Sequence, residues 1–252
     1  MTAIRIAAAQ STSIAGDIAA NVQTHLKFVE VASQANVDLL IFPELSLSGY
    51  ELTLLQECLL HPEDIRHTAL RDAAVKTNMT VVVGAPVSAG HGTAPAIGAI
   101  TFFPDGRYSV YRKQHLHPGE DLYATASYAT VRTDALLGQS YSLAICADTA
   151  YEAHAANAAK AGASLYLAGV LVSEAGYAAD SAKMQRYAAS LGLGVLMANH
   201  GGPSGGCVSA GKSAFWAPSG KLIVQAQGTG NVLVIATNSS DSWAGELIAI
   251  NS

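Results

Sequence analysis

The sequence predicts an α/β fold in which helices cover a mixed β-sheet. Short apolar runs alternate with segments of helical periodicity, the pattern typical of strand–helix–strand units. A hairpin signal, Pro104-Asp105-Gly106 between two apolar runs, interrupts the alternation, so the sheet cannot be purely parallel. The only stretch rich in Gly, Ser and Pro, at 201–206, is short and directly follows an expected strand. Residues 1–252 are therefore predicted to form one domain.

Each expected element has a local pattern behind it. Residues 4–9 form a short apolar run typical of a buried strand. Gly16 and Asp17 precede apolar side chains at helical spacing from Ile18 to Ala32, which predicts an amphipathic helix. The other predicted elements, in chain order, are strand 37–42, helix 62–78, strand 80–85, hairpin strands 97–103 and 107–113, strand 141–146, helix 150–161, strand 165–172, helix 178–191, strand 194–198 and, from 207 to 237, strands interrupted by Pro218-Ser219-Gly220.

The composition is that of a globular protein with little charge to cover its surface. Hydrophobic residues make up 50% of the 252 residues and charged residues 13%, against about 25% charged residues in an average domain. This composition excludes a disordered chain and argues against a coiled coil. Some of the apolar surface should be covered by another subunit, so we expect a homo-oligomer.

Charge and cysteine usage predict the partners and the compartment. The net charge is −5 and no basic stripe is present, so we expect no nucleic-acid partner. Cys58, Cys146 and Cys207 are odd in number and far apart, which fits the reducing cytoplasm. The start of the chain lacks the pattern of a signal peptide, and the longest apolar runs are about half the ~20 residues of a membrane helix. We therefore expect a soluble cytoplasmic protein without a membrane partner.

Three polar residues stand where predicted strands end. Glu44 follows the run 38–43, Lys113 closes the second hairpin strand, and Cys146 follows the run 142–145. Ligands bind at strand ends in open α/β sheets because the connecting loops separate there. A cysteine at a strand-to-helix turn also faces the positive end of the following helix, which predicts a lowered pKa for Cys146.

The motifs around these residues resemble those of the carbon–nitrogen hydrolases, the nitrilase superfamily, and in particular its amidase-like branch. Any one of these motifs is weak, whereas three in the right order and spacing are specific, and the resemblance covers nearly the whole chain. The motifs are Phe42-Pro43-Glu44 with Ser48-Gly49-Tyr50, then Arg112-Lys113-Gln114-His115-Leu116 with Glu120, and then Ile145-Cys146-Ala147-Asp148.

The resemblance implies a four-layer αββα sandwich with mixed β-sheets and a catalytic set of Glu, Lys and Cys. Cys146 would attack an amide carbonyl carbon and form an acyl-enzyme. Glu44 would be the general base, and Lys113 would stabilise the oxyanion together with the backbone N–H of Ala147. Glu120 would match the second glutamate, which positions the reacting groups. No metal or organic cofactor is implied, and the subunits are expected to form a homodimer or a larger even-numbered oligomer.

Departures from the family pattern indicate the substrate. Ala147 stands where an aromatic residue is common, and no arginine follows it within 148–151 to bind a substrate carboxylate. The segment 168–172 lacks the Pro and Trp of many members, so we expect a wider or more apolar pocket near Ala147 and Leu171. Tyr50, Ala147 and Leu171 are the predicted substrate-binding residues. The expected reaction is hydrolysis of a small, mostly uncharged carboxamide.

Other functions remain open from the sequence alone. A nitrilase would use the same thiolate on a nitrile carbon, and a catalytically silent binding protein could share the fold. His115, His117 and Glu120 form a His-x-His-x-x-Glu pattern that could bind a metal, although no third histidine is close by in the sequence. A Cys–His hydrolase could use His115, His117 or His200 as its base.

Overall fold

Two β-sheets packed face to face form the centre of the structure, a computed structural model that describes residues 3–61, 63–240 and 242–251. Within these residues the first sheet has the strand order β13-β12-β1-β2-β3-β4-β5 and the second β11-β10-β9-β8-β7-β6. The strands are β1 (Ile4–Gln10), β2 (Leu39–Ile41), β3 (Thr80–Val87), β4 (Ala96–Phe102), β5 (Tyr108–Arg112), β6 (Asp134–Leu136), β7 (Gln139–Ile145), β8 (Leu165–Val170), β9 (Gly194–Asn199), β10 (Ala214–Trp216), β11 (Leu222–Gln225), β12 (Val232–Ser239) and β13 (Ser242–Ala249).

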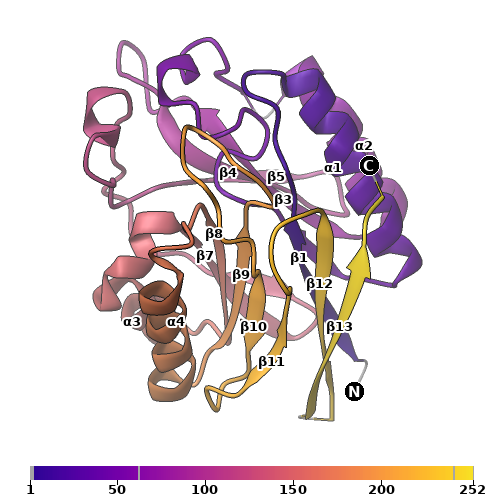
Figure 1. The fold of residues 1–252 in the computed structure, drawn as a ribbon. Coiled ribbons are helices and arrows are strands. Elements are labelled where there is room, and N and C mark those ends of the chain that lie inside the picture. The colour runs from indigo at the N-terminus through magenta and orange to yellow at the C-terminus, as the bar shows by residue number, and fades with distance from the viewer. Residues whose placement is uncertain (1–2, 62, 241, 252) are drawn as a thin grey trace.

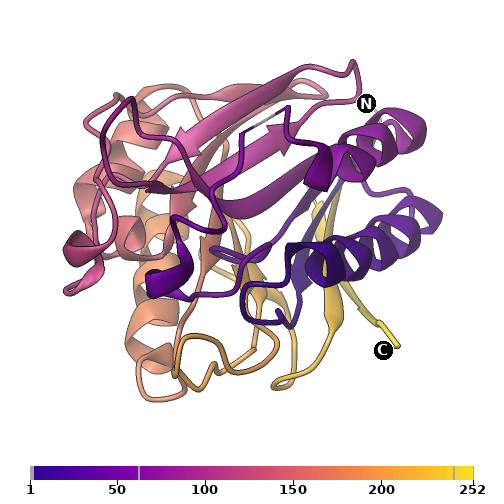
Figure 2. The same ribbon diagram turned by 90° about the horizontal axis from the view of Figure 1, so that it is seen from above.

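Helices cover the two outer faces. Figure 1 shows α1 (Ile18–Gln34) and α2 (Thr68–Thr77) beside the first sheet and α3 (Glu152–Lys160) and α4 (Tyr177–Leu191) beside the second, and Figure 2 shows the same arrangement from above. Buried apolar side chains accordingly form three clusters, one between each pair of adjacent layers. This confirms the predicted αββα sandwich.

The apolar run at β3 shows why the sequence forms these layers. Val81 and Val83 belong to the cluster under α1 and α2, whereas Val82 belongs to the cluster between the two sheets. Successive side chains of a strand point to opposite faces, so a strand buried on both faces needs an unbroken apolar run. The same reason explains the continuous apolar composition of β8, all of whose residues are buried.

Both sheets are mixed, as predicted, and their topology gathers the candidate residues at one end. β1, β2 and β3 are parallel, whereas β3–β4 and β4–β5 are antiparallel pairs. β5 therefore runs in the same direction as β2, and the segments that follow both strands leave the same edge. In the second sheet β7, β8 and β9 are parallel.

Several predicted bounds differ from the structure. The helix expected at 62–78 begins only at Thr68, after a 3-10 turn at Ile65–His67, while residue 62 lies outside the described residues. Residues 207–213 form no strand of either sheet, although strands were expected from 207 onward. β6 and β13 were not predicted: β6 has only three residues, and β13 is largely exposed.

Candidate active site

The segment that carries Glu44 lies between the two sheets and needs glycines on both sides. A Cβ on Gly84 of β3 would collide with Pro43 O and Leu45 N, and one on Gly169 of β8 would lie 2.7 Å from Phe42 O. Leu45 itself has a φ of 49°, which non-glycine residues rarely adopt. Close packing and a strained backbone therefore fix the position of Glu44.

Two further contacts hold this segment from the side of the core. His200, which directly follows β9, donates from Nε2 to the backbone oxygen of Glu44 at 2.7 Å. The hydroxyl of Ser46 accepts the backbone N–H of Gly84 at 3.1 Å and lies 2.9 Å from His25 Nε2. The backbone around Glu44 is thus connected to both sheets and to α1.

Lys113 lies between two carboxylates. Its ammonium group donates to Glu44 Oε1 at 2.6 Å and to Glu120 Oε1 at 2.7 Å, and all three side chains are buried. Glu120 Oε1 also accepts the hydroxyl of Tyr50 at 2.6 Å, and Glu120 Oε2 accepts the backbone N–H of His117 at 2.7 Å. Tyr50, predicted to bind substrate, therefore contacts the second carboxylate.

Cys146 has a strained backbone at the end of β7. Its φ is 41°, in the left-handed region that costs a non-glycine residue roughly 1–3 kcal/mol. Thr149 Oγ1 donates to the Cys146 carbonyl at 2.7 Å, and the thiol donates to the carbonyl of Leu171 at 3.7 Å. Leu171 thus meets the candidate nucleophile through its backbone, while Ala147 lies half-buried in the same turn.

The ionisable groups alter one another's proton affinity. Burial raises the pKa of Glu44 to about 7, and Glu120 adds to this, whereas Lys113 and the Cys146 thiol lower it. Burial and the Glu44 carboxylate raise the pKa of Cys146 above its usual value, against the effect of Lys113. The lowered thiol pKa predicted from the sequence is therefore wrong, since Cys146 begins a 3-10 turn and α3 begins only at Glu152.

Lys113 remains the cationic member of the group. Burial lowers its pKa, but Glu44, Cys146 and Glu120 together raise it above the usual value. Glu44 Oε2 has no hydrogen-bond partner among the described residues. A thiol, a carboxyl group with one free oxygen and an ammonium group are suited to nucleophilic attack on a carbonyl carbon with stabilisation of the resulting oxyanion.

The histidines considered as metal ligands or bases have other partners. His115 Nδ1 lies 3.1 Å from Asp148, and His117 Nδ1 lies 3.2 Å from Pro118 O. Across the described ranges, no three His, Cys, Asp or Glu side chains gather into a possible metal site. His200 contacts the backbone of Glu44. Glu44 and Cys146 affect each other's pKa, whereas none of these three histidines contributes to the pKa shift of Cys146, so Glu44 is the better candidate for its partner.

Sequence reasoning named Asp148 and His200 but did not predict their contacts in the site. Asp148 is wholly buried and accepts hydrogen bonds from the segments on both sides of Lys113. Its place two positions after Cys146 was the available signal. His200 was considered only as a base, and nothing in the sequence indicates its contact with Glu44.

Comparison with known proteins identifies the family. The family model described as carbon-nitrogen hydrolase matches residues 5–244. The chain belongs to the carbon-nitrogen hydrolase family. Among solved structures, a mutant of the amidase from Nesterenkonia sp. AN1 in complex with butyramide superposes with a TM-score of 0.86 and 23% identity, over 94% of this chain and 92% of that one. Another structure, described as the NitN amidase from the same source, gives a TM-score of 0.84 and 24% identity, over 92% and 91% of the two chains.

Curated relatives of this carbon-nitrogen hydrolase are much longer proteins. A glutamine-dependent NAD(+) synthetase of Xanthomonas campestris pv. campestris (strain 8004) is 29% identical over 175 residues, which is 65% of this chain and 30% of that protein. The enzyme of the same name from Mycobacterium leprae (strain TN) is 27% identical over 144 residues, or 51% and 21%. The chain therefore matches less than a third of either relative. In the described part of the chain, the structure has no helix with the length and apolarity to span a membrane.

Proposed function

We propose that this carbon-nitrogen hydrolase is an amidase that cleaves the C–N bond of a small, mostly uncharged carboxamide through an acyl-enzyme on Cys146. The observation that carries this proposal is the buried group of Glu44, Lys113 and Glu120 beside the Cys146 thiol. Neutral amides are also favoured by the absence of Lys and Arg from residues 147–151. The structurally similar Nesterenkonia amidase was solved with butyramide, a small neutral amide.

The reaction proceeds in two halves that use the same groups. The Cys146 sulfur attacks the carbonyl carbon as Glu44 takes the thiol proton, and Lys113 with the Ala147 N–H stabilises the oxyanion. Glu44 then gives its proton to the leaving nitrogen, which departs as ammonia or amine. In the second half Glu44 takes a proton from water, the resulting hydroxide attacks the thioester, and the sulfur leaves and is reprotonated. The products are a carboxylic acid and free enzyme.

The thiol pKa and the carboxyl pKa support this order of steps. Because the pKa of Cys146 is raised, the thiol keeps its proton at neutral pH until a base removes it during attack. Glu44, with a pKa of about 7, is matched to that task near neutral pH.

The activity is tested by ammonia release from a panel of neutral amides, urea and matched nitriles. Glutamine belongs in the panel as a zwitterionic amide, because the curated relatives are named glutamine-dependent. We expect turnover of small neutral amides and loss of turnover in Cys146→Ala, with Cys207→Ala as the matched control that keeps activity. Preference for the nitrile of a matched pair would support the nitrilase alternative. No turnover of any compound, together with no labelling of Cys146 by iodoacetamide, would support a silent binding protein.

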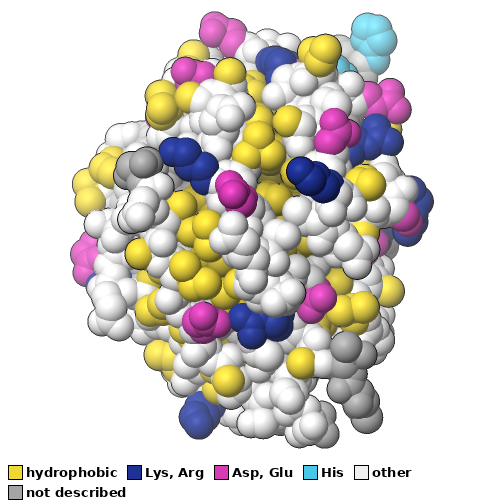
Figure 3. All heavy atoms as spheres, turned by 90° about the vertical axis from the view of Figure 1, so that its right-hand side faces the viewer, with side chains coloured by type: hydrophobic (Ala, Val, Ile, Leu, Met, Phe, Trp, Pro, Cys, Tyr) yellow, Lys and Arg dark blue, Asp and Glu magenta, His cyan; other side chains and the backbone are white. Residues whose placement is uncertain are grey.

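We further propose that the chain acts as one domain, in the cytoplasm, within a homodimer or a larger even-numbered homo-oligomer. Large apolar side chains such as Ile65, Leu122 and Tyr128 are exposed. Figure 3 shows further hydrophobic side chains gathered between isolated charged ones on the face that lies to the right in Figure 1. Light scattering at micromolar concentration should give at least twice the monomer mass. A monomer at that concentration would contradict the oligomer.

A further inference from the structure

The carboxylate of Asp148 binds the segment that carries Lys113 on both sides of that lysine. Asp148 Oδ2 accepts the hydroxyl of Tyr111, two positions before Lys113, at 2.6 Å. Asp148 Oδ1 accepts the backbone N–H groups of Gln114 at 3.1 Å and His115 at 2.8 Å, directly after Lys113. The segment that carries Lys113, directly after β5 of the first sheet, is thus bound by a side chain from the turn that follows β7 of the second sheet.

The same carboxylate also holds the turn that carries Cys146. Asp148 Oδ2 accepts the backbone N–H of Ile145 at 3.0 Å, immediately before the cysteine. The left-handed φ of Cys146 persists only if the surrounding contacts fix it. The Ile145 contact and the hydrogen bond from Thr149 to the Cys146 carbonyl fix the turn from both sides.

A chain of hydrogen bonds connects Asp148 to the interior of the second sheet. Because the Tyr111 hydroxyl donates its hydrogen to Asp148, His154 Nε2, at 2.9 Å, must donate to the Tyr111 oxygen. His154 Nδ1 then accepts the hydroxyl of Tyr166 on β8 at 2.8 Å. Burial lowers the pKa of His154, so its neutral form suits both contacts. Buried networks that are fully satisfied hold their members in one geometry.

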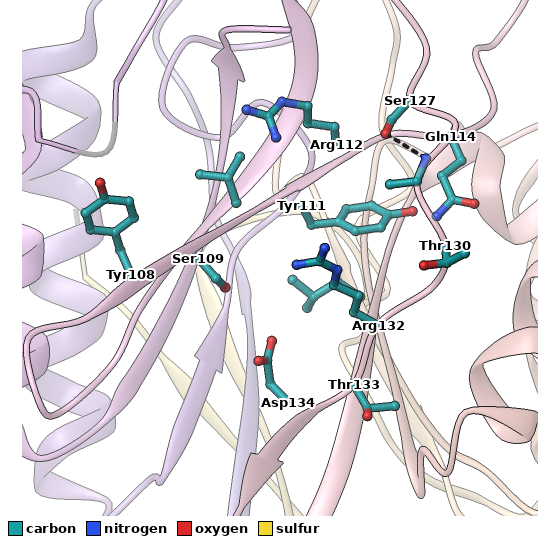
Figure 4. Close-up of a pocket in the computed structure, with 13 residues that line it drawn as sticks. Tyr108, Ser109, Tyr111, Arg112, Gln114, Ser127, Thr130, Arg132, Thr133 and Asp134 are labelled. Atoms are coloured by element: carbon teal, nitrogen blue, oxygen red, sulfur yellow. Dashed lines mark hydrogen bonds between the residues drawn. The ribbon is translucent and has the colours of Figure 1, made fainter. Parts of the chain in front are cut away.

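The strand end that carries Lys113 borders a cavity on its outer side. Tyr111 and Gln114 form part of the wall of a cavity of about 650 Å³ beside β5, shown in Figure 4. None of Glu44, Lys113 and Cys146 lines this cavity. The Lys113 backbone is held by its own N–H, which donates to Ile97 O at 2.8 Å, and by its carbonyl, which accepts the N–H of Ser127 at 2.9 Å. Asp148 adds contacts to the positions on either side of it, and these are the contacts that reach across to the Cys146 turn.

From this geometry, and resting on the amidase function proposed above, we propose that Asp148 is a positioning residue that sets Lys113 and Cys146 relative to each other across the two sheets. An amide cannot replace the carboxylate. In the Asp148→Asn variant only the side-chain oxygen would accept, so the NH2 group would face either the Ile145 N–H or the N–H groups of Gln114 and His115. Asp148→Asn therefore keeps the volume of the side chain and breaks the connection between the two segments.

The first measurement is the rate at which iodoacetamide alkylates Cys146, followed by mass spectrometry of the peptide that contains it. This measurement requires no amide substrate. As long as a variant is folded, its alkylation rate does not depend on its free energy of unfolding. We expect Asp148→Asn to slow the alkylation by about tenfold or more, because a shift of about 1 Å in a reacting group has large effects on rate. Tyr111→Phe, the matched control, removes one donor and keeps all three backbone donors, so its rate should stay within about threefold of wild type.

The second measurement is the amide kinetics of the same proteins at a temperature where circular dichroism shows each to be folded. Asp148→Asn should lower kcat by about 100-fold while KM changes by less than about threefold. A folded Asp148→Asn protein with wild-type alkylation and wild-type kcat would overturn the positioning role. If wild type is alkylated at Cys146 but hydrolyses no amide, the proposed function fails, and the alkylation rates alone still decide the role of Asp148.

If Asp148→Asn does not fold, hydrogen exchange in the wild-type protein decides. In the described part of the chain, the N–H groups of Gln114 and His115 have no acceptor other than Asp148. We expect both to be protected to the same degree as the N–H of Ile145, because one carboxylate binds all three. Rapid exchange at Gln114 and His115 with slow exchange at Ile145 would contradict the positioning role.

Discussion

Lys113 Nζ lies 2.6 Å from Glu44 Oε1, and both side chains are wholly buried although 69 positions separate them in the chain. With Glu120 on its other side, a single ammonium group is shared by two carboxyl groups. Burial, with a further contribution from the nearby Glu120 carboxylate, raises the pKa of Glu44 to about 7 against the opposing effect of Lys113. The arrangement places a carboxyl group with a pKa near neutrality beside an ammonium group whose pKa is raised.

The pH dependence of activity should report this base. We expect kcat/KM for a neutral amide to rise with pH up to about 7, where Glu44 loses its proton, and then to level off. Below that pH the rate should change by about tenfold per pH unit. The measurement is a pH–rate profile with a substrate that does not titrate in this range. A profile that is flat from pH 5 to 8 would contradict Glu44 as the base.

Variants at Lys113 and Glu120 should shift the acid limb of the pH–rate profile, the range in which the rate rises with pH, in opposite directions. Lys113 lowers the pKa of Glu44, so Lys113→Met should move the limb to higher pH. Glu120 raises it, so Glu120→Gln should move the limb to lower pH. The two variants serve as controls for each other, because a general loss of structure would not shift the limb in opposite senses. Shifts of the same sign would show that charge does not control the pKa of Glu44.

Removing the charge of Lys113 should cost most of the activity. Lys113→Met keeps the length of the side chain and removes the donor to the oxyanion, which predicts a loss of roughly 10²–10³-fold in kcat/KM. Glu44→Gln should give a comparable loss, and adding either change to the other should cost little more, since members of one catalytic unit are not additive. More than about a tenth of wild-type kcat/KM in either folded variant would contradict the mechanism and favour the Cys–His alternative.

The sequence indicated where the catalytic candidates lie because each stands next to a strong local signal. Glu44, Lys113 and Cys146 follow strands whose apolar runs are easy to locate, and the parallel topology then places the strand ends together. The αββα layers were predicted through the family resemblance and are confirmed by the three core clusters.

The parts that could not be predicted depend on contacts between distant segments. The raised pKa of Cys146 results from burial and from Glu44, which a sequence does not place around the thiol. The hydrogen bond from the Tyr50 hydroxyl to Glu120, 70 positions away, was not predicted either, and substrate binding by Tyr50 stays a prediction. The contacts of Asp148 and His200 also join distant segments. Asp148 accepts the hydroxyl of Tyr111 from the other sheet, and His200 binds the backbone of Glu44 in the segment between the sheets.

Acid stability should depend on His200. Its imidazole is wholly buried, and burial lowers its pKa to about 4 from an ordinary 6.5. The neutral form donates to the Glu44 backbone oxygen. Because the pKa is lowered in the folded protein, the unfolded chain takes up a proton first as the pH falls below 6.5. The stability present above pH 6.5 is therefore lost progressively between pH 6.5 and about 4.

His200→Gln removes this titration while keeping a side-chain donor for the Glu44 carbonyl. The free energy of unfolding is measured by urea titration at pH 7.5 and at pH 5. Between these two pH values it should fall by about 2 kcal/mol more in wild type than in His200→Gln. His91→Gln, at an exposed position, is the matched control and should behave as wild type. If the stability of wild type and that of His200→Gln depend on pH in the same way, burial does not lower the pKa of His200 in the folded protein, and the prediction is wrong.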